Sequence, residues 1–111
     1  MIVNLETKKE QINIIQNIFN DKWKIKIICS LLNKERRLKD LNKGINNITQ
    51  KTLIVKLKEL EKKGLVEKRY FPEVPPKVVY SVTPVGKKLK PIIFSMLTWV
   101  DKYKINFISK I

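Results

Sequence analysis

Residues 47 to 83 constrain the fold of this chain more than any other stretch. A Lys-rich segment comes first, in which Leu53, Leu57 and Leu60 recur at the spacing of one helix face, and it ends at Gly64. Gly64 stands where the end of a helix needs a left-handed residue, and the leucine after it can contact Leu60 as in a Schellman ending. Because a hairpin pattern begins at once after this ending, the sequence predicts a helix joined at a fixed angle to two strands.

The hairpin is predicted from two segments rich in β-branched and aromatic residues, 65–71 and 78–83. The tip from Pro72 to Lys77 contains three prolines, which lack N–H donors and therefore keep the tip from pairing as a sheet edge. Thr83 and Pro84 are a typical N-cap and first residue of a helix, so the second strand should stop there.

Apolar spacing predicts the remaining helices. A first helix is expected at about 6–20, and a second, apolar on more than one face, after Asp21 as its N-cap. A brief strand at 35–37 and a short helix ended by Gly44 should follow. The Asn46–Asn47 pair predicts the turn into the Lys-rich helix, because asparagine tolerates a positive φ.

The Lys-rich helix should begin after Thr49 as its N-cap, and the final helix should kink at Pro91. Two helices joined by a tight turn and followed by a hairpin predict a mainly α fold with a small β-hairpin wing, a winged helix-turn-helix with extra N- and C-terminal helices. At 111 residues the chain has room for one modest core. We therefore expect a single domain, made of an N-terminal helix at 1–20, a core and wing at 21–83, and a C-terminal helix at 84–111.

Charge narrows the choice of partner. Lys and Arg number 24 against 10 Asp and Glu, which gives a net charge of +14. Residues 1–20 carry none of this excess, because their two basic and two acidic groups cancel. A field of this sign attracts nucleic acid, an anionic membrane or an acidic protein. Lysine richness is also typical of A+T-rich genomes, but its placement in the folded part favours a binding surface.

The sequence offers little for catalysis or for a membrane. It has no His, three Gly and one Cys, so we expect no metal site, no Gly-rich phosphate loop, no cofactor and no enzymatic activity. The longest apolar run, around 91–100, is far below the roughly 20 residues that span a bilayer, and no signal peptide is evident. Cys29 lies among apolar residues, which favours a buried thiol over a redox sensor, and a lone Cys agrees with a cytoplasmic protein.

The face of the Lys-rich helix opposite its leucines carries side chains suited to the edges of DNA bases. Gln can pair with adenine and Lys with guanine or phosphate, and the methyl groups of Val and Thr can contact thymine. The candidate readers are Gln50, Lys51, Thr52, Val55 and Lys56. For this helix alone a solvated face is an equal alternative, because basic amphipathic helices are common.

Basic residues of the hairpin and of the preceding short helix are candidates for contacts to the DNA backbone, which set register and affinity. They are Arg37, Lys39, Lys68, Arg69 and Lys77. Ordinary solvation is the alternative for each of them. Because the hairpin is attached to the reader helix, double-stranded DNA is the expected partner.

The outer helices have apolar residues left over once a small core is formed. A homodimer interface is the natural use for them, since two-fold symmetry fits palindromic sites with reader helices about one DNA turn apart. The candidate interface residues are Ile12, Ile15, Phe19, Ile93, Met96, Trp99, Val100, Tyr103 and Phe107. A ligand pocket along the last helix is a less common use of such a stripe, and the sequence identifies no small-molecule effector.

Four segments resemble the HxlR family of winged helix-turn-helix regulators: Asp21–Lys24, Ile48–Leu53, Leu57–Val66 and Tyr70–Thr83. The most specific is the Pro-Glu-Val-Pro-Pro-Lys run with the Tyr-Ser-Val-Thr that follows, and the similarity covers about residues 20–99. The resemblance implies a dimeric, cytoplasmic bacterial or archaeal transcription factor, usually a repressor, that dimerises through its first and last helices. It carries the reader role to Thr49, Gln50, Lys51, Thr52, Val55 and Lys56.

The chain departs from the family at three places. Many members respond to aldehydes, quinones or oxidants through a Cys-Pro pair before the first helix, and this pair is missing. Leu38 replaces a usual aromatic and Asn46–Asn47 a common Pro-Gly turn, and both changes are conservative for the fold. We expect a non-enzymatic homodimeric regulator, with a protein-interaction module or a non-specific nucleic-acid-binding module as alternatives.

Overall fold

The structure is a computed structural model that describes residues 2–108, with side chains described for residues 2–104. Its elements in chain order are α1 (Lys9–Phe19), α2 (Lys24–Asn33), α3 (Leu38–Gly44), α4 (Gln50–Lys62), β1 (Val66–Phe71), β2 (Lys77–Val82), α5 (Pro84–Lys87) and α6 (Leu89–Ile108). These bounds lie within a few residues of those that apolar spacing predicts. The mainly helical, winged architecture is therefore confirmed.

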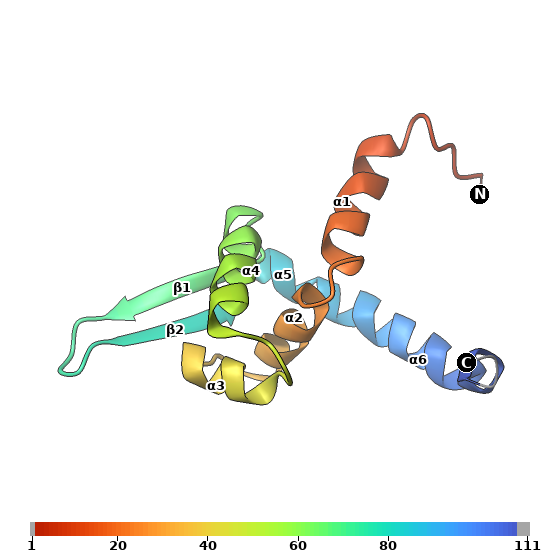
Figure 1. Ribbon diagram of the computed structural model, residues 1–111. Helices are drawn as coiled ribbons and strands as arrows, with labels where there is room; N and C mark the ends of the chain where they lie inside the picture. The colour runs from red at the N-terminus through yellow and green to blue at the C-terminus, as the bar shows by residue number, and fades with distance from the viewer. Residues whose placement is uncertain (1, 109–111) are drawn as a thin grey trace.

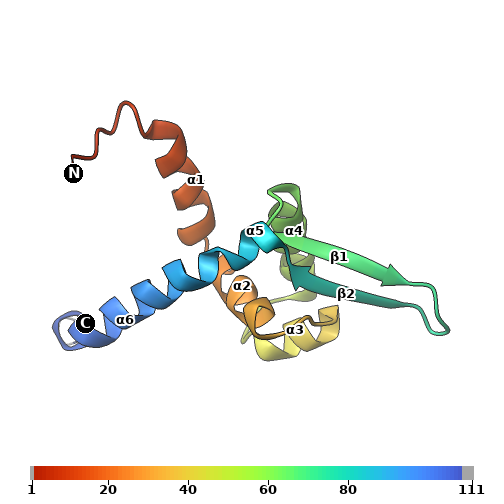
Figure 2. The ribbon, with the colours of Figure 1, turned by 180° about the vertical axis from the view of Figure 1, so that it is seen from behind.

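Figures 1 and 2 show α2 at the centre, with α3, α4 and the β1–β2 hairpin grouped around it. α1 and α6 leave this group on the side opposite to the hairpin and diverge from each other. The radius of gyration is 16.4 Å, whereas a compact chain of this length would have about 13 Å. The projecting helices and the wing account for this extended shape.

The core forms where α2, α3 and α4 meet. Its largest fully buried side chains are Ile27, Ile28, Leu41, Leu53, Leu57 and Leu60. Each stabilises the fold by about 1.5 to 3 kcal/mol on burial. Three of them come from α4 at the spacing of one helix face, so their burial decides which face of α4 remains outside.

The end of α4 is built as the sequence predicts. Gly64 has a φ of 76°, the Leu65 N–H donates to the Leu60 carbonyl over 3.0 Å, and the Gly64 N–H donates to the Glu61 carbonyl over 3.0 Å. These two bonds define a Schellman motif. The Thr83 hydroxyl closes the junction from the hairpin side by donating to the Gly64 carbonyl at 2.6 Å. Helix and wing are thus joined by directional bonds, which fix the angle between them.

The hairpin pairs β1 and β2 antiparallel. The paired residues run from Val66 and Val82 at its base to Phe71 and Lys77 at its tip. Arg36 adds an isolated bridge to this sheet, since it exchanges backbone hydrogen bonds of 3.0 and 2.8 Å with Tyr80. The brief strand expected at 35–37 is therefore reduced to a single bridging residue, which ties the α2–α3 connection to the wing.

The start of α2 differs from the prediction. The helix begins at Lys24, so Asp21 is separated from it by a turn and is not its N-cap. The Asp21 carboxylate nevertheless accepts hydrogen bonds from the Trp23 N–H at 2.8 Å and the Lys24 N–H at 3.0 Å. The expected side-chain bonds are present, but the turn that they close precedes the regular helix.

The C-terminal helix is interrupted at Lys88, shortly before Pro91, where a kink was expected. α5 ends at Lys87 and α6 begins at Leu89. Pro91 explains the position of the break, because it has no N–H to donate to the carbonyl of Lys87 four residues back. The predicted N-cap is confirmed, since Thr83 accepts the Gly86 N–H at 3.0 Å.

Candidate DNA-binding interface

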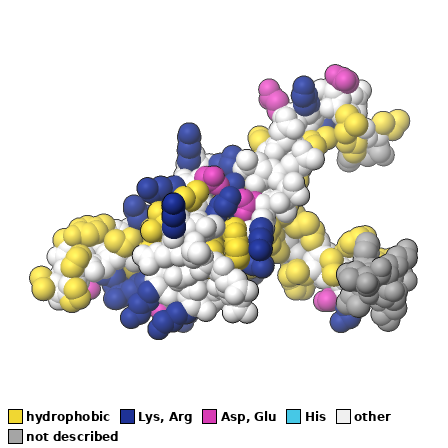
Figure 3. Space-filling model, viewed as in Figure 1, with side chains coloured by type: hydrophobic (Ala, Val, Ile, Leu, Met, Phe, Trp, Pro, Cys, Tyr) yellow, Lys and Arg dark blue, Asp and Glu magenta, His cyan; other side chains and the backbone are white. Residues whose placement is uncertain are grey.

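The outer face of α4 is set by the turn and the cap that precede it. Asn47 has a φ of 66°, as the predicted turn requires, and Thr49 caps the helix by accepting the Thr52 N–H at 3.1 Å. Of the predicted readers, Thr49, Gln50, Lys51 and Val55 are exposed, while Thr52 is half-buried. Val55 is 46 % exposed, so its methyl groups are accessible on this face. Figure 3 shows Lys and Arg side chains gathered around α4 and along the edge between α3 and the wing.

Lys56 does not belong to this exposed face. Its Nζ lies 2.6 Å from Asp21 Oδ2 and 3.7 Å from Glu59 Oε2. Lys56 follows Leu53 by three residues and precedes Leu60 by four, so helical spacing places it at the border of the buried face. The prediction that Lys56 reads bases is corrected accordingly, because the carboxylates of Asp21 and Glu59 already contact its ammonium group.

The contact between Asp21 and Lys56 changes the ionisation of both groups. Burial alone would raise the pKa of Asp21, but hydrogen bonds from Lys56 and from the backbone N–H groups of Trp23 and Lys24 outweigh it and lower the pKa. The hydrogen bond to Asp21 raises the pKa of Lys56, although burial opposes this shift. Both side chains therefore stay charged at neutral pH.

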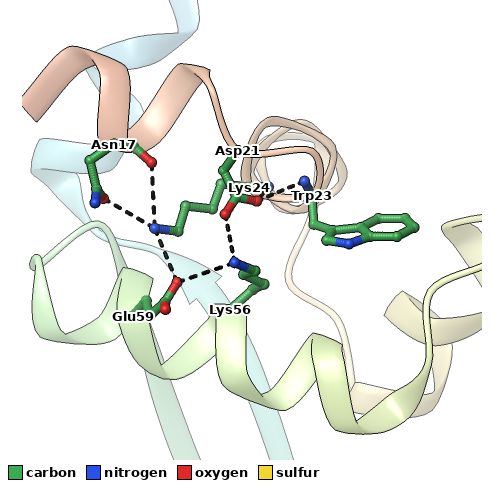
Figure 4. Close-up of polar contacts among 6 residues, drawn as sticks. All are labelled: Asn17, Asp21, Trp23, Lys24, Lys56 and Glu59. Atoms are coloured by element: carbon green, nitrogen blue, oxygen red, sulfur yellow. Dashed lines mark hydrogen bonds and ion pairs between the residues drawn. The ribbon is translucent and has the colours of Figure 1, made fainter.

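Lys24 extends this arrangement toward α1. The residue is 3 % exposed, and its Nζ lies 3.1 Å from Asn17 Oδ1, 3.5 Å from the Asn17 carbonyl and 3.1 Å from Glu59 Oε2 (Figure 4). We refer to Asn17, Asp21, Lys24, Lys56 and Glu59 as the junction network. Its members come from the end of α1, the turn after it, α2 and α4, so it connects an outer helix to the helix with the reader face.

The wing places two of the predicted backbone-contacting residues around one aromatic ring. The Phe71 ring centroid lies 4.9 Å from Lys77 Nζ and 5.9 Å from Arg69 Cζ, both within the range of cation–π contacts. Arg69 also forms an ion pair with Glu35 of the α2–α3 connection. Lys68 is exposed. The ring aligns two cationic groups along the wing, and Glu35 is a carboxylate with which a DNA phosphate would compete for Arg69.

Arg37 and Lys39 lie beside hollows at the edge of the same surface. A hollow of about 560 Å³ between α3, the α2–α3 connection and β2 is lined by Arg37 and three further basic residues, together with Glu35 and Asp40. A second hollow, of about 400 Å³, brings Lys39 next to Gln50 at the start of α4. Lys39, selected from α3, and Gln50, selected from α4, are therefore neighbours in space.

Two exposed residues of this surface were not selected from the sequence. Lys58 follows Lys51 by seven residues and Val55 by three, so it stands on the same outer face of α4. Helical spacing would have identified it. Tyr70 is exposed on β1, and alternation along the strand gave no sign that this aromatic side chain faces water.

The outer helices expose an extended apolar surface. Of the predicted interface residues, Ile15, Met96, Trp99, Val100 and Tyr103 are exposed, and so are Ile14, Ile92, Phe94 and Leu97, which were not selected. The rings of Trp99 and Tyr103 contact each other at a centroid distance of 5.8 Å. Large apolar patches are rare on monomeric proteins and mark interaction surfaces.

The structure corrects one member of the predicted interface and leaves another outside its scope. Ile93 is 4 % exposed and packs in the core of its own chain, so it is not available to a partner. Phe19 also packs against the core and is half-buried, as is Ile12 on α1. Phe107 lies outside the residues whose side chains are described.

Cys29 is half-buried in α2, and burial raises the pKa of its thiol. A thiol in this state has little thiolate at neutral pH. None of the described helices combines the length and the hydropathy that crossing a bilayer requires.

Comparisons with known sequences agree with this geometry. A family model described as HxlR-like helix-turn-helix matches residues 18–106. YkvN of Bacillus subtilis, an uncharacterized HTH-type transcriptional regulator, is 41 % identical over 90 residues, which cover 81 % of this chain and 76 % of YkvN.

Solved structures of transcriptional regulators have a similar fold. The reduced form of the transcriptional regulator YodB from B. subtilis is similar with a TM-score of 0.78 at 30 % identity, covering 93 % of this chain and 95 % of that one. The redox regulator HypR in its reduced form is similar with a TM-score of 0.82 at 29 % identity, covering 89 % of this chain and 98 % of that one. The chain therefore belongs to the HxlR family of helix-turn-helix transcriptional regulators, which bind DNA and are not enzymes.

Proposed function

We propose that the protein is a cytoplasmic transcriptional repressor that binds a palindromic operator as a homodimer. The observation that carries this proposal is the exposed basic face of α4 beside a wing whose Arg69 and Lys77 flank the Phe71 ring. In such a complex α4 lies in the major groove, and the wing reaches the neighbouring backbone or minor groove. Residues 21–83 bind DNA, and the helices within 1–20 and 84–111 form the dimer.

The reader set in this proposal consists of the exposed start of α4. Gln50 pairs with adenine, Lys51 with guanine or phosphate, and Val55 offers its methyl groups to thymine. Thr49 and Thr52 stand at the same end of the helix, and Lys58 extends the face toward the backbone. Lys56 is left out because it is held by Asp21. The backbone contacts come from Arg37, Lys39, Lys68, Arg69 and Lys77.

A titration followed by fluorescence anisotropy tests the DNA-binding part. With DNA from upstream of its own gene, we expect sequence-selective binding that weakens with salt, with a slope of log K against log[salt] of about −0.9 per neutralised phosphate. Gln50→Ala and Lys51→Ala should each weaken binding by about 1 to 3 kcal/mol. Lys63→Ala removes an equal charge from the far end of α4 and is the matched control for Lys51→Ala. Equal affinity for a scrambled duplex would remove the claim of specificity.

The apolar surface of α1 and α6 supports the dimer. Light scattering should give a dimer at micromolar concentration, and Met96→Glu should shift it toward monomer, because a buried unpaired carboxylate is costly. Val74→Glu is the matched control, since Val74 is fully exposed at the wing tip and lies outside the proposed interface. A monomer in the unaltered protein would contradict this part of the proposal.

The alternative functions predict different outcomes. A protein-interaction module would lose no DNA affinity on Gln50→Ala, because its charge serves an acidic partner. A non-specific nucleic-acid-binding protein would bind structured RNA as well as the upstream duplex at the same salt concentration, which a competition assay measures.

A further inference from the structure

The junction network connects the anchored end of α1 to α4. Asn17 precedes Ile18, the buried residue of α1, while α1 residues farther from the core, such as Ile14, are exposed. Asn17 accepts a hydrogen bond from Lys24, and Lys24 contacts Glu59 of α4 (Figure 4). A change in the position of α1 would therefore be transmitted to α4 through the buried ammonium group of Lys24.

The chemistry of this connection favours a geometric role over a stabilising one. An ammonium group that is almost fully buried loses its hydration, and a buried ion pair often stabilises a protein no more than apolar side chains of the same volume would. Apolar contacts are non-directional. The hydrogen bond of 3.1 Å from Lys24 to Asn17, in contrast, fixes both distance and direction, and the ion pair of 3.1 Å between Lys24 and Glu59 fixes the distance to α4.

A second contact restrains the same helix. Lys56 of α4 bonds to Asp21 in the turn after α1 at 2.6 Å, and it also approaches Glu59. The two contacts hold α4 at positions one helical turn apart, so rotation of α4 about either contact alone is opposed by the other. The network thereby holds α4 at a defined angle to the end of α1.

We propose that Lys24 is a positioning residue that links the seating of α1 to the direction of α4 through Glu59, and so selects the spacing between operator half-sites. This inference rests on the proposed function, because only a dimer that uses α1 has two half-sites at a set distance. In that dimer the partner fixes α1, and each α4 keeps a constant angle to its own α1. In an operator with another spacing, the second half-site would then lie outside the reach of the second α4 of the dimer.

The test uses duplexes that the unaltered protein selects from a random pool, with the natural half-site spacing or with one base pair added or removed. One base pair turns a half-site by about 35°, and we expect the unaltered protein to prefer the natural spacing by about tenfold or more. Lys24→Met keeps most of the length of the side chain without its charge, and Asn17→Ala removes the side-chain oxygen that Lys24 contacts at 3.1 Å, which leaves only the backbone carbonyl of residue 17 at 3.5 Å. Each should lower the spacing preference by about threefold or more, whereas Asn17→Asp keeps an oxygen for Lys24 and should retain it.

Lys22→Met is the matched control, since it removes an exposed lysine from the turn between α1 and α2 without touching the junction network. Circular dichroism and thermal melting of each variant show whether it is folded, so that a loss of folding is distinguished from a changed direction of α4. If Lys24→Met fails to fold, Asn17→Ala decides, because Asn17 is exposed. An unaltered spacing preference in folded Asn17→Ala overturns the inference and leaves the proposed function standing. Equal binding of the unaltered protein to every spacing would instead remove the dimeric operator, and the inference with it.

Discussion

The half of the molecule around α4 and the half formed by α1 and α6 use their apolar residues differently. In α4, the leucines of one face are buried, and hydrogen-bonded caps close both ends of the helix. In α6, Phe94, Leu97 and Met96 are exposed although the helix is rich in apolar residues. The core around α4 is completed within one chain, whereas the outer helices carry apolar side chains that stay exposed among the described residues.

Replacing a leucine by alanine should therefore change the free energy of unfolding differently in the two halves. Leu57 in α4 is 1 % exposed and Leu97 in α6 is 56 % exposed. We expect Leu57→Ala to lower the free energy of unfolding by about 2 to 5 kcal/mol, because it leaves a cavity in a packed core. Leu97→Ala should lower it by about 0.5 kcal/mol or less in dilute protein, and by more at concentrations where the proposed dimer forms.

Urea unfolding followed by circular dichroism, at two protein concentrations about a hundredfold apart, measures both effects. An equal loss for the two variants in dilute protein would show that α6 is already packed within the single chain. The comparison between the halves would then be wrong.

The Asp21 carboxylate lies between the two halves and should show its effect through pH. Asp21→Asn is expected to lower the free energy of unfolding at pH 7 by about 1.5 to 3 kcal/mol, since a hydrogen bond to a charged group is lost. Because the folded-state pKa of Asp21 is lowered, its contribution is fully present above the unfolded value of about 3.9 and is lost as pH falls through the lower folded value.

The measurement is the urea midpoint of the unaltered protein and of Asp21→Asn between pH 2.5 and 7. Their difference should be constant at neutral pH and should shrink below about pH 4. Glu10→Gln replaces an exposed carboxylate of α1 and should leave the midpoint nearly unchanged at every pH. A difference between the two proteins that persists unchanged at the lowest pH would rule out the carboxylate charge as the cause.

Contacts close in sequence could be predicted, and contacts between distant residues could not. The Gly64 ending, the Thr49 cap and the Thr83–Pro84 start each depend on bonds within about five residues, so local sequence identifies them. The bond between Lys56 and Asp21 joins residues 35 positions apart. Nothing near either residue distinguishes it from an ordinary surface charge, which explains why Lys56 was interpreted as a reader.

The outer helices show the same limit. Apolar spacing identified α6 but could not tell which of its faces meets the core, because the helix is apolar around most of its circumference. Ile93 was therefore grouped with Met96, although one is buried and the other is exposed. The site candidates of α3 and the wing depended on charge alone, and only the fold shows that Arg37, Glu35 and Arg69 are neighbours in space.

Gly44 and Gly64 lie at the ends of α3 and α4, in the half of the molecule around α4, and they allow a smaller, matched comparison. An added Cβ would meet no other atom within 4 Å at Gly64 or at Gly44, but only Gly64 has a positive φ, of 76°. We expect Gly64→Ala to lower the free energy of unfolding by about 1 to 2 kcal/mol through backbone strain. Gly44→Ala should leave it unchanged or raise it by up to about 1 kcal/mol, because alanine favours the helix. Thermal and urea unfolding measure the free energy of unfolding of both variants. Equal changes for Gly64→Ala and Gly44→Ala would contradict backbone strain at Gly64.

The smallest effect is expected at Cys29, which lies in α2 between the two halves. Burial raises the pKa of its thiol, so the thiolate that reacts with oxidants is scarce at neutral pH. Diamide treatment should therefore leave the DNA affinity unchanged within about twofold, and Cys29→Ala should change the free energy of unfolding by about 1 kcal/mol or less. Anisotropy titrations before and after treatment, with Cys29→Ala as the control, check this. A large loss of affinity that Cys29→Ala abolishes would mean that α2 opens enough to expose the thiol, and that the core joining the two halves is less rigid than its burial indicates.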